Sequence, residues 1–361
     1  MPDESRPTQA AILAALASVQ EPELGQDLVA LGMIKDLQIR GGEVGFSLEL
    51  TTPASPYKAQ LETDARQVVL AVPGVTQAEV RLTFAVRSDG RTRGQPGQPI
   101  RNAVAVASGK GGVGKTTVAV NMAVALAEAG AKVGLLDADI YGPNVPTMMG
   151  IQSLPEPVQG KLVPAEAFGV RVMSIAFLVP PGQPLIWRGP MLHSAIRQFI
   201  ADVAWGELDY LIVDLPPGTG DAQLSLTQTL PLSGGVIVTL PQKVSLEDAR
   251  RGLEMFRTMD VPLLGVVENM SYLELPDGTR YDVFGQGGGE ALAQQAGVPF
   301  LGAIPMQAEV RLAGDSGKPV VVSHPEGPVA RALVSITQQI AARLSLQATR
   351  QPATIPLEMV D

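Results

Sequence analysis

Two lysines lie in one glycine-rich stretch, ASGKGGVGKTT at residues 107–117. The stretch fits the phosphate-binding pattern G-x-x-x-x-G-K-[ST], in which glycines let backbone amides curl around phosphate oxygens. In this pattern Lys115 reaches the β- and γ-phosphates, and Thr116 offers its hydroxyl to Mg²⁺. A glycine-rich turn without a ligand is the alternative, but a strand expected before the loop and a helix after it weigh against that. The residues predicted to hold the nucleotide are Gly109, Lys110, Gly111, Gly112, Val113, Gly114, Lys115, Thr116 and Thr117.

The first lysine, Lys110, lies too early in the loop to replace Lys115. A lysine at this position could reach across a dimer interface to the partner's nucleotide. It would then neutralise charge in the transition state, as arginine fingers do with an effect of roughly 10³–10⁵ in rate. The alternative is an ordinary solvated surface lysine.

Three aspartates follow apolar runs and are predicted to serve the phosphates. Asp214 ends the run in YLIVDLPPGTGD, where an unpaired carboxylate would be costly, so a water-bridged Mg²⁺ is predicted to compensate it. Asp137 and Asp139 end the run in LLDADIYGPN, and one of them, with Asp139 favoured, would position the attacking water or a metal-bound water. A helix cap for Asp214 and a capping or turn pair for the other two are the alternatives. Residues 216–221 are interpreted as a switch segment that senses the γ-phosphate.

The elements that position these residues are short apolar runs separated mostly by helical stretches. The runs are AVAVAS, KVGLLDAD, VRVMSIAF, YLIVDLP, GVIVTLP, LLGVVEN and PFLGAIP. Apolar strands that alternate with helices predict an α/β fold whose mostly parallel sheet has helices on both faces. In such sheets the ligand lies at the carboxyl ends of the strands.

A Gly-, Pro- and Gln-rich stretch, SDGRTRGQPGQPI, is typical of a linker and divides the chain. Before it, two helical stretches and three strand-like stretches predict a small α/β domain. The predicted organisation is a small α/β domain over residues 1–87, a linker over 88–100, the nucleotide-binding domain over 101–347 and a tail over 348–361.

Composition narrows the class of protein. The chain has 361 residues, 45% hydrophobic residues and a net charge of −9, which argue for a folded protein and against a nucleic-acid binder. The longest nearly apolar run, 172–187, contains three prolines and is too short to span a bilayer, and no signal peptide is visible at the start. A cytoplasmic protein without nucleic-acid or membrane partners is expected.

The motifs together resemble a known group of proteins. KGGVGKTT, LLDADIYGPN and YLIVDLPPGTGD are similar to deviant Walker A ATPases, and DADIYGPN, PLIWRGPM, DLPPGTGD and ENMSY resemble their Mrp branch of iron–sulfur cluster carriers. EPELGQDLVALGMI and LTTPASPYKAQL resemble the small domain of iron–sulfur assembly proteins. The resemblance implies a homodimer that sandwiches two ATP molecules, hydrolyses them with Lys110 acting in trans, and transfers clusters to apoproteins. It also implies that Asn269 and Pro305 lie beside the adenine, with a turn or cap role as the alternative for Asn269. No N-K-x-D guanine motif is present, which favours ATP.

The chain departs from this family at the cluster ligands. Mrp carriers have a C-x-x-C pair that aligns with Leu275 and Gly278, and the small domain tends to carry a cysteine at Ser55, but this chain contains no cysteine. Clusters need thiolates, with histidine an occasional substitute, and neither His193 nor His324 pairs with a second soft ligand. The carboxylates of residues 274 and 277 could bind a hard cation, although such a pair on a turn is usually only solvated.

Three functions remain open at this point. The first is an Mrp-type ATPase of iron–sulfur cluster assembly, in which the cluster is implied by the resemblance alone. The second is a nucleotide-dependent adaptor without a cluster, which uses the small domain as its binding module. The third is a spatial organiser like the partition and septum-siting ATPases.

Overall fold

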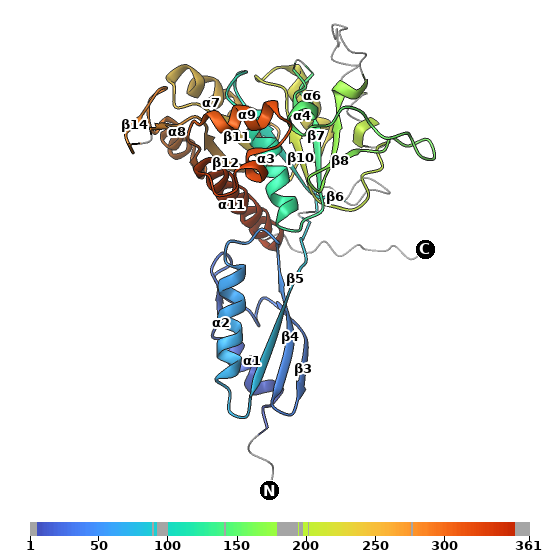
Figure 1. Ribbon diagram of the computed structural model, residues 1–361, viewed down its shortest axis with the longest axis vertical. Helices are drawn as coiled ribbons and strands as arrows, with labels where there is room; N and C mark the ends of the chain where they lie inside the picture. Colours follow the sequence, from blue (N-terminus) through green and yellow to red (C-terminus); the bar gives the residue numbers. More distant parts are fainter. Residues whose placement is uncertain are drawn as a thin grey trace. The chain divides into compact units, whose positions relative to one another are not determined.

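The computed structural model describes residues 6–88, 90–91, 100–140, 142–178, 194, 198–200, 202–275 and 277–350. Most of the predicted linker, most of the predicted tail, His193 and the segment PLIWRGPM lie outside these residues. The chain divides into two compact units, one with the residues up to Arg87 and those from Ser345 onward, the other from Ser88 to Leu344 (Figure 1).

The first unit is a three-stranded sheet with two helices. Antiparallel strands β3 (Ile34–Arg40) and β4 (Glu43–Leu50) are followed by β5 (Gln77–Phe84), which pairs with β4 in parallel. Helix α2 (Lys58–Leu70) packs on this sheet and against α1 (Gln9–Leu16). The short strands β1 (Gln20–Glu21) and β2 (Gln26–Asp27) pair separately. Alternate residues of β4 and the inner faces of both helices form one buried apolar cluster, because the strand period is two and the helix period 3.6.

The second unit contains an eight-stranded sheet in the order β15-β12-β11-β6-β10-β7-β9-β8. Its strands are β6 (Ile100–Ala107), β7 (Val133–Asp137), β8 (Ala165–Ala167), β9 (Val170–Ser174), β10 (Leu208–Asp214), β11 (Gly234–Thr239), β12 (Leu263–Glu268) and β15 (Phe300–Ala303). All neighbouring pairs are parallel except the edge pair β8–β9. Each of the seven apolar runs therefore forms a strand, and the predicted α/β class is confirmed.

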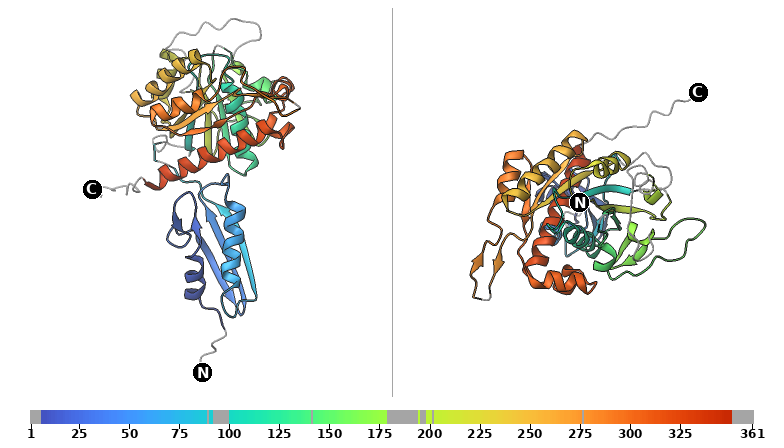
Figure 2. Two further views of the ribbon diagram at one scale, coloured as in Figure 1. Left: turned by 90° about the vertical axis from the view of Figure 1, so that its left-hand side faces the viewer. Right: turned by 90° about the horizontal axis from the view of Figure 1, so that it is seen from above.

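Helices cover both faces of this sheet (Figure 2). The described helices that follow β6 in the chain are α3 (Lys115–Glu128), α4 (Val145–Met148), η1 (Ile175–Leu178), α6 (Asp221–Thr229), α7 (Lys243–Thr258), α8 (Gly288–Ala296), α9 (Ala308–Asp315), α10 (Val320–Ser323) and α11 (Pro328–Arg350). Ala103, Ala105 and Ala107 of β6 share a core with Leu253 and Phe256 of α7. None of the described helices combines the length and apolar character that crossing a bilayer requires.

The strand order places a candidate ligand site at the middle of the sheet. β6 lies between β10 and β11. After β6 the chain forms β7 to β10 on one side of it, and it then crosses to the other side to form β11, β12 and β15. In open parallel sheets this reversal leaves a crevice beyond the carboxyl ends of the central strands. The loops after β6, β7, β10 and β12 therefore converge on one edge.

Candidate nucleotide-binding site

The glycine-rich loop joins β6 to α3, as the sequence predicts. Gly114 has φ +84°, and a Cβ there would lie 2.1 Å from the Nδ2 atom of Asn269. A Cβ at Gly109 would lie 2.1 Å from the backbone carbon of Asp248. Only glycine fits these two positions, so the loop can pass close to its neighbours and place the first amides of α3 over the cavity. Those amides have no partner within the helix and favour an anion.

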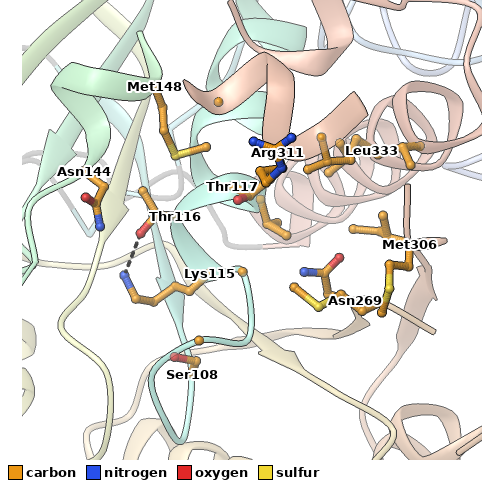
Figure 3. A pocket seen from close by; sticks show the side chains of 18 of the residues that line it. Ser108, Lys115, Thr116, Thr117, Asn144, Met148, Asn269, Met306, Arg311 and Leu333 are labelled. Atoms are coloured by element: carbon orange, nitrogen blue, oxygen red, sulfur yellow. Dashed lines mark hydrogen bonds between the residues drawn. The ribbon is translucent and has the colours of Figure 1, made fainter. Parts of the chain in front are cut away.

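A buried ionic cluster lies directly after this loop. The Lys115 ammonium is 2.6 Å from Oδ1 of Asp214 and 3.4 Å from Oδ2 of Asp139. The Thr116 hydroxyl donates to Oδ2 of Asp214 at 2.7 Å and lies beside the Lys115 ammonium (Figure 3). Burial raises the pKa of the Asp214 carboxyl, whereas the Lys115 charge and the two hydrogen bonds oppose this rise. Strand register sets the cluster, because Asp214 pairs with Val106, two residues before the loop begins.

The structure separates the two aspartates after β7. Asp139 lines the cavity and approaches Lys115. Asp137 is fully buried, and its carboxylate accepts from the amides of Asp139 and Val145 and from the Ser174 hydroxyl at 2.8 Å. Burial raises the pKa of the Asp137 carboxyl, and the nearby Asp214 charge adds to this rise. Asp137 thus holds the segment that follows β7 through buried hydrogen bonds. Asp139 is the aspartate that lines the cavity.

A cavity of about 630 Å³ extends from the loop toward α9 and α11 (Figure 3). Asn269 and Pro305, the two predicted base contacts, both line it. The Nδ2 atom of Asn269 donates one hydrogen to the Val113 carbonyl at 2.8 Å, a bond that leaves out its amide oxygen and its second N–H hydrogen. The cavity therefore has a glycine-rich end at the loop and a second end where the Asn269 side-chain amide, fixed by the Val113 carbonyl, lies beside Pro305 in the lining.

Much of the apolar wall was not predicted from the sequence. Met148 of α4, Val310 of α9 and Leu333 of α11 line the cavity together with Met306, and Arg311 lies beside them. Met306 directly follows the predicted Pro305, whereas Met148 and Leu333 occupy ordinary helix positions that the predicted motifs do not include. Only their convergence in the fold identifies them.

Lys110 and the predicted switch segment both lie next to the loop. Lys110 lines the cavity, is partly exposed, and its ammonium is 3.5 Å from Oε1 of Gln242. In the segment 216–221, the Gly218 amide donates to the Ser108 carbonyl at 2.9 Å, and Pro217 lines the cavity. The segment is therefore joined to the start of the loop by a backbone hydrogen bond.

Leu275 and Gly278 are the positions where the resemblance places the family's cysteines. They lie between the two strands of a small hairpin, β13 (Leu273–Glu274) and β14 (Arg280–Tyr281). The amide of Gly278 donates to the Leu275 carbonyl at 2.9 Å, and the Asp277 carboxylate accepts from the Thr279 amide. That bond lowers the pKa of Asp277. The Glu274 carboxylate pairs with Arg280 at 3.5 Å, so both acidic side chains are engaged locally.

The donor set distinguishes two kinds of metal. The Thr116 hydroxyl and the Asp214 carboxylate are hard oxygen ligands of the kind that Mg²⁺ takes. A cluster needs thiolates, and the chain has none. His324 is exposed and contacts the Ser323 hydroxyl, and the described ranges contain no group of three or more His, Asp or Glu that could hold a metal. The residues present therefore fit Mg²⁺ and do not fit an iron–sulfur cluster.

Comparisons with known families match nearly the whole chain. Residues 99–341 match the family described as NUBPL iron-transfer P-loop NTPase, and residues 9–80 match that of the iron–sulfur cluster assembly protein. An iron–sulfur cluster carrier protein of Synechocystis is 52% identical over 354 residues, covering 94% of this chain and 99% of that protein.

Two solved structures have the same fold as the second unit. The ADP complex of a nucleotide-binding protein from Archaeoglobus fulgidus is 38% identical, covers 63% of this chain and 90% of that one, and has a TM-score of 0.56. The septum site-determining protein MinD of Pyrococcus horikoshii, solved with Mg-ADP, is 21% identical, covers 66% of this chain and 95% of that one, and has a TM-score of 0.52. The second likeness extends to the fold alone.

Proposed function

Because the chain belongs to the family of NUBPL-type iron-transfer P-loop NTPases, we propose that it binds ATP with Mg²⁺ and hydrolyses it to ADP and phosphate. The observation that carries this proposal is the cluster of Lys115, Thr116 and Asp214 at the end of the glycine-rich loop. It supplies a cation for the phosphates and hard oxygen ligands for the metal within one hydrogen-bonded group.

Each residue of the cluster has a distinct task in this proposal. Lys115 would leave Asp214 and turn to the β- and γ-phosphates, and Asp214 and the Thr116 hydroxyl would hold Mg²⁺, the former through a water. Bound Mg²⁺ neutralises charge that develops on the phosphate oxygens. Asp139 orients the attacking water, because it faces the cavity, whereas Asp137 holds the loop from below.

Asn269 favours adenine over guanine. The Val113 carbonyl can only accept, so it fixes the Asn269 amide with its nitrogen toward the loop. The oxygen of that amide accepts from the 6-amino group of adenine, whereas the 6-oxo group of guanine has no hydrogen to donate to it. Pro305 supports the base from its position in the cavity wall.

The active species is proposed to be a homodimer in which Lys110 of each chain completes the partner's site. Lys110 is partly exposed at the cavity, and its contact with Gln242 is long and easily exchanged. The Lys110 ammonium then neutralises the phosphate charge of the transition state only when two chains have paired, so hydrolysis depends on dimerisation.

The proposed role is in iron–sulfur cluster assembly on client apoproteins, with the cluster's thiolates supplied by the client or by a partner. The resemblance to cluster carriers supports the pathway, and the lack of cysteine excludes a thiolate-ligated cluster held by this chain alone. That same lack favours a second candidate, a nucleotide-dependent adaptor that handles no cluster.

Two measurements test these proposals. Phosphate release from ATP is expected for the full chain with Mg²⁺ and is expected to be lost in Lys115→Ala; hydrolysis at the wild-type rate by that variant would refute the assigned site. Anaerobic reconstitution with iron and sulfide, followed by visible absorbance and iron content, is expected to give no stoichiometric cluster unless a thiol-bearing client is added. If no cluster forms even after a thiol-bearing client is added, the result would favour the nucleotide-dependent adaptor that handles no cluster.

A further inference from the structure

One buried carboxylate holds both ends of the segment that contains the hairpin. Glu268, the last residue of β12, is 1% exposed. Its Oε1 accepts from the Ser271 hydroxyl at 2.5 Å, and its Oε2 accepts from the Gly289 amide at 2.6 Å. Ser271 and Gly289 flank residues 272–288, so both tethers of this segment meet at a single side chain.

The local sequence makes this arrangement specific. The Gly289 amide belongs to the first turn of α8, where amides lack a partner within the helix and a carboxylate is favoured by the helix dipole. A Cβ at residue 289 would lie 2.9 Å from the Cβ of Glu268, so glycine is needed for this approach. A carboxylate buried to this degree would be costly without such partners, and the two tethers supply them.

The same strand end forms the base side of the cavity. Asn269 follows Glu268 directly, lines the cavity and donates to the loop at Val113. The Ile304 amide donates to the Glu268 carbonyl at 2.8 Å, and the Ser271 amide donates to the Ile304 carbonyl at 2.9 Å.

This pairing continues toward the hairpin. The Met306 amide donates to the Tyr272 carbonyl at 2.7 Å, and both Ile304 and Met306 line the cavity. The base-side wall of the cavity is thus continuous with the first strand of the hairpin through an unbroken series of hydrogen bonds.

We propose that Glu268 is a positioning residue that links nucleotide occupancy of the cavity to the position of residues 272–288. The inference rests on the proposed nucleotide site. A base that contacts Asn269 fixes the end of β12, and Glu268 transmits this restraint to both ends of the hairpin segment. The link uses no cysteine, so it can operate in this chain at the positions where the resemblance to Mrp carriers places the cluster ligands.

Hydrogen exchange of the full chain, with and without Mg-ADP, tests the link. In the wild type, Mg-ADP is expected to slow exchange across residues 272–288 as well as in the glycine-rich loop. In Glu268→Ala, Mg-ADP still slows exchange in the loop, but the response of residues 272–288 is lost. The Gly289 amide, deprived of its charged acceptor, exchanges about 10- to 100-fold faster.

Three further variants separate the link from a purely structural effect. Glu268→Gln can accept from the Gly289 amide and donate to the Ser271 hydroxyl, so it is expected to restore the response of the hairpin. Ser271→Ala removes one tether and is expected to weaken the response at the start of the segment without unfolding the domain. Ser323→Ala removes a serine hydroxyl from the end of α10 and serves as the matched control with a wild-type response.

The possible failures can be distinguished. If fluorescent ADP does not bind the wild type, the proposed nucleotide site fails and the link fails with it. If ADP binds and protects the loop but leaves exchange of residues 272–288 unchanged, the link alone is refuted. A full hairpin response in both Glu268→Ala and Ser271→Ala would equally overturn it.

Discussion

Lys115 is expected to stabilise the nucleotide-free fold by compensating Asp214, and this can be measured without any assay of function. Asp214 is 0% exposed and its charge is met by the Lys115 ammonium at 2.6 Å. Removing one partner of a buried ion pair costs about 3–5 kcal/mol, because the other charge is left uncompensated. Since Thr116 continues to donate to Asp214, Lys115→Met is expected at the lower end, about 3 kcal/mol.

The double variant Lys115→Met/Asp214→Asn is expected to recover most of that loss. Replacing both members of a buried ion pair by neutral groups of similar volume is often neutral or stabilising. The side-chain amide that replaces the Asp214 carboxylate can still accept from the Thr116 hydroxyl, so the double variant is expected within about 1 kcal/mol of the wild type. The double variant is therefore expected to be about 2–3 kcal/mol more stable than Lys115→Met alone.

Thermal unfolding followed by tryptophan fluorescence measures this cycle. Trp205 is 0% exposed and donates to the Phe199 carbonyl, so its emission reports on the core of the second unit. At about 2–4 °C per kcal/mol for a domain of this size, Lys115→Met lowers Tm by about 6–12 °C. A single variant as stable as the wild type, or a double variant no better than the single one, would refute the compensation of Asp214 by Lys115.

Three further predictions concern other parts of the chain. Lys110→Ala is expected to bind ATP but lose hydrolysis, and mixing it with Lys115→Ala chains restores at most one working site per dimer; full phosphate release by Lys110→Ala alone would contradict the action in trans. Asn269→Ala is expected to reduce the preference for ATP over GTP about 10-fold or more, as the loss of one specific hydrogen bond implies, and an unchanged ratio in competition binding would exclude Asn269 as the base reader. Burial, with a contribution from the Glu21 charge, raises the pKa of Glu23 to about 7 from 4.5, so its contribution to stability is complete below pH 4.5 and is lost as the pH rises through 7; carbon NMR of the side-chain carboxyl in the full chain measures this value, and an apparent pKa near 4.5 would contradict it.

The sequence predicts the fold well because its signals are local. Each apolar run is long enough for one buried strand, and the helices between the runs leave a parallel sheet as the simplest arrangement. The glycine-rich loop is equally local, since its strand, turn and helix are consecutive. The antiparallel edge strand β8 was not predicted, because a three-residue strand carries little periodic signal.

Only part of the candidate site is made of residues that are close in the sequence, and this limits what the sequence can predict. The spacing of Asp137 and Asp139 does not show which one faces the cavity; the Ser174 hydroxyl, from a neighbouring strand, settles their geometry. The tethers of Glu268 are also invisible in the sequence, because a glutamate at a strand end looks like any solvated residue. Both depend on side chains that only the folded sheet brings together.

Restoring the missing ligands would test whether the hairpin itself has kept the geometry of a carrier. The hairpin turn is closed by two backbone hydrogen bonds, from the Leu275 amide to the Thr279 carbonyl and from the Gly278 amide to the Leu275 carbonyl. An added Cβ at Gly278 would meet no atom within 4 Å. Because Gly278 has φ +82°, a cysteine there costs about 1–3 kcal/mol of local strain, which leaves the rest of the domain intact. Leu275→Cys/Gly278→Cys is therefore expected to fold, to hydrolyse ATP and to take up iron on anaerobic reconstitution, with one cluster shared by two chains. The single variant Leu275→Cys is the control and is expected to hold less iron, because two thiolates per dimer cannot complete a four-thiolate site. A double variant that hydrolyses ATP but binds no more iron than the wild type would show that the hairpin has lost the geometry as well as the ligands.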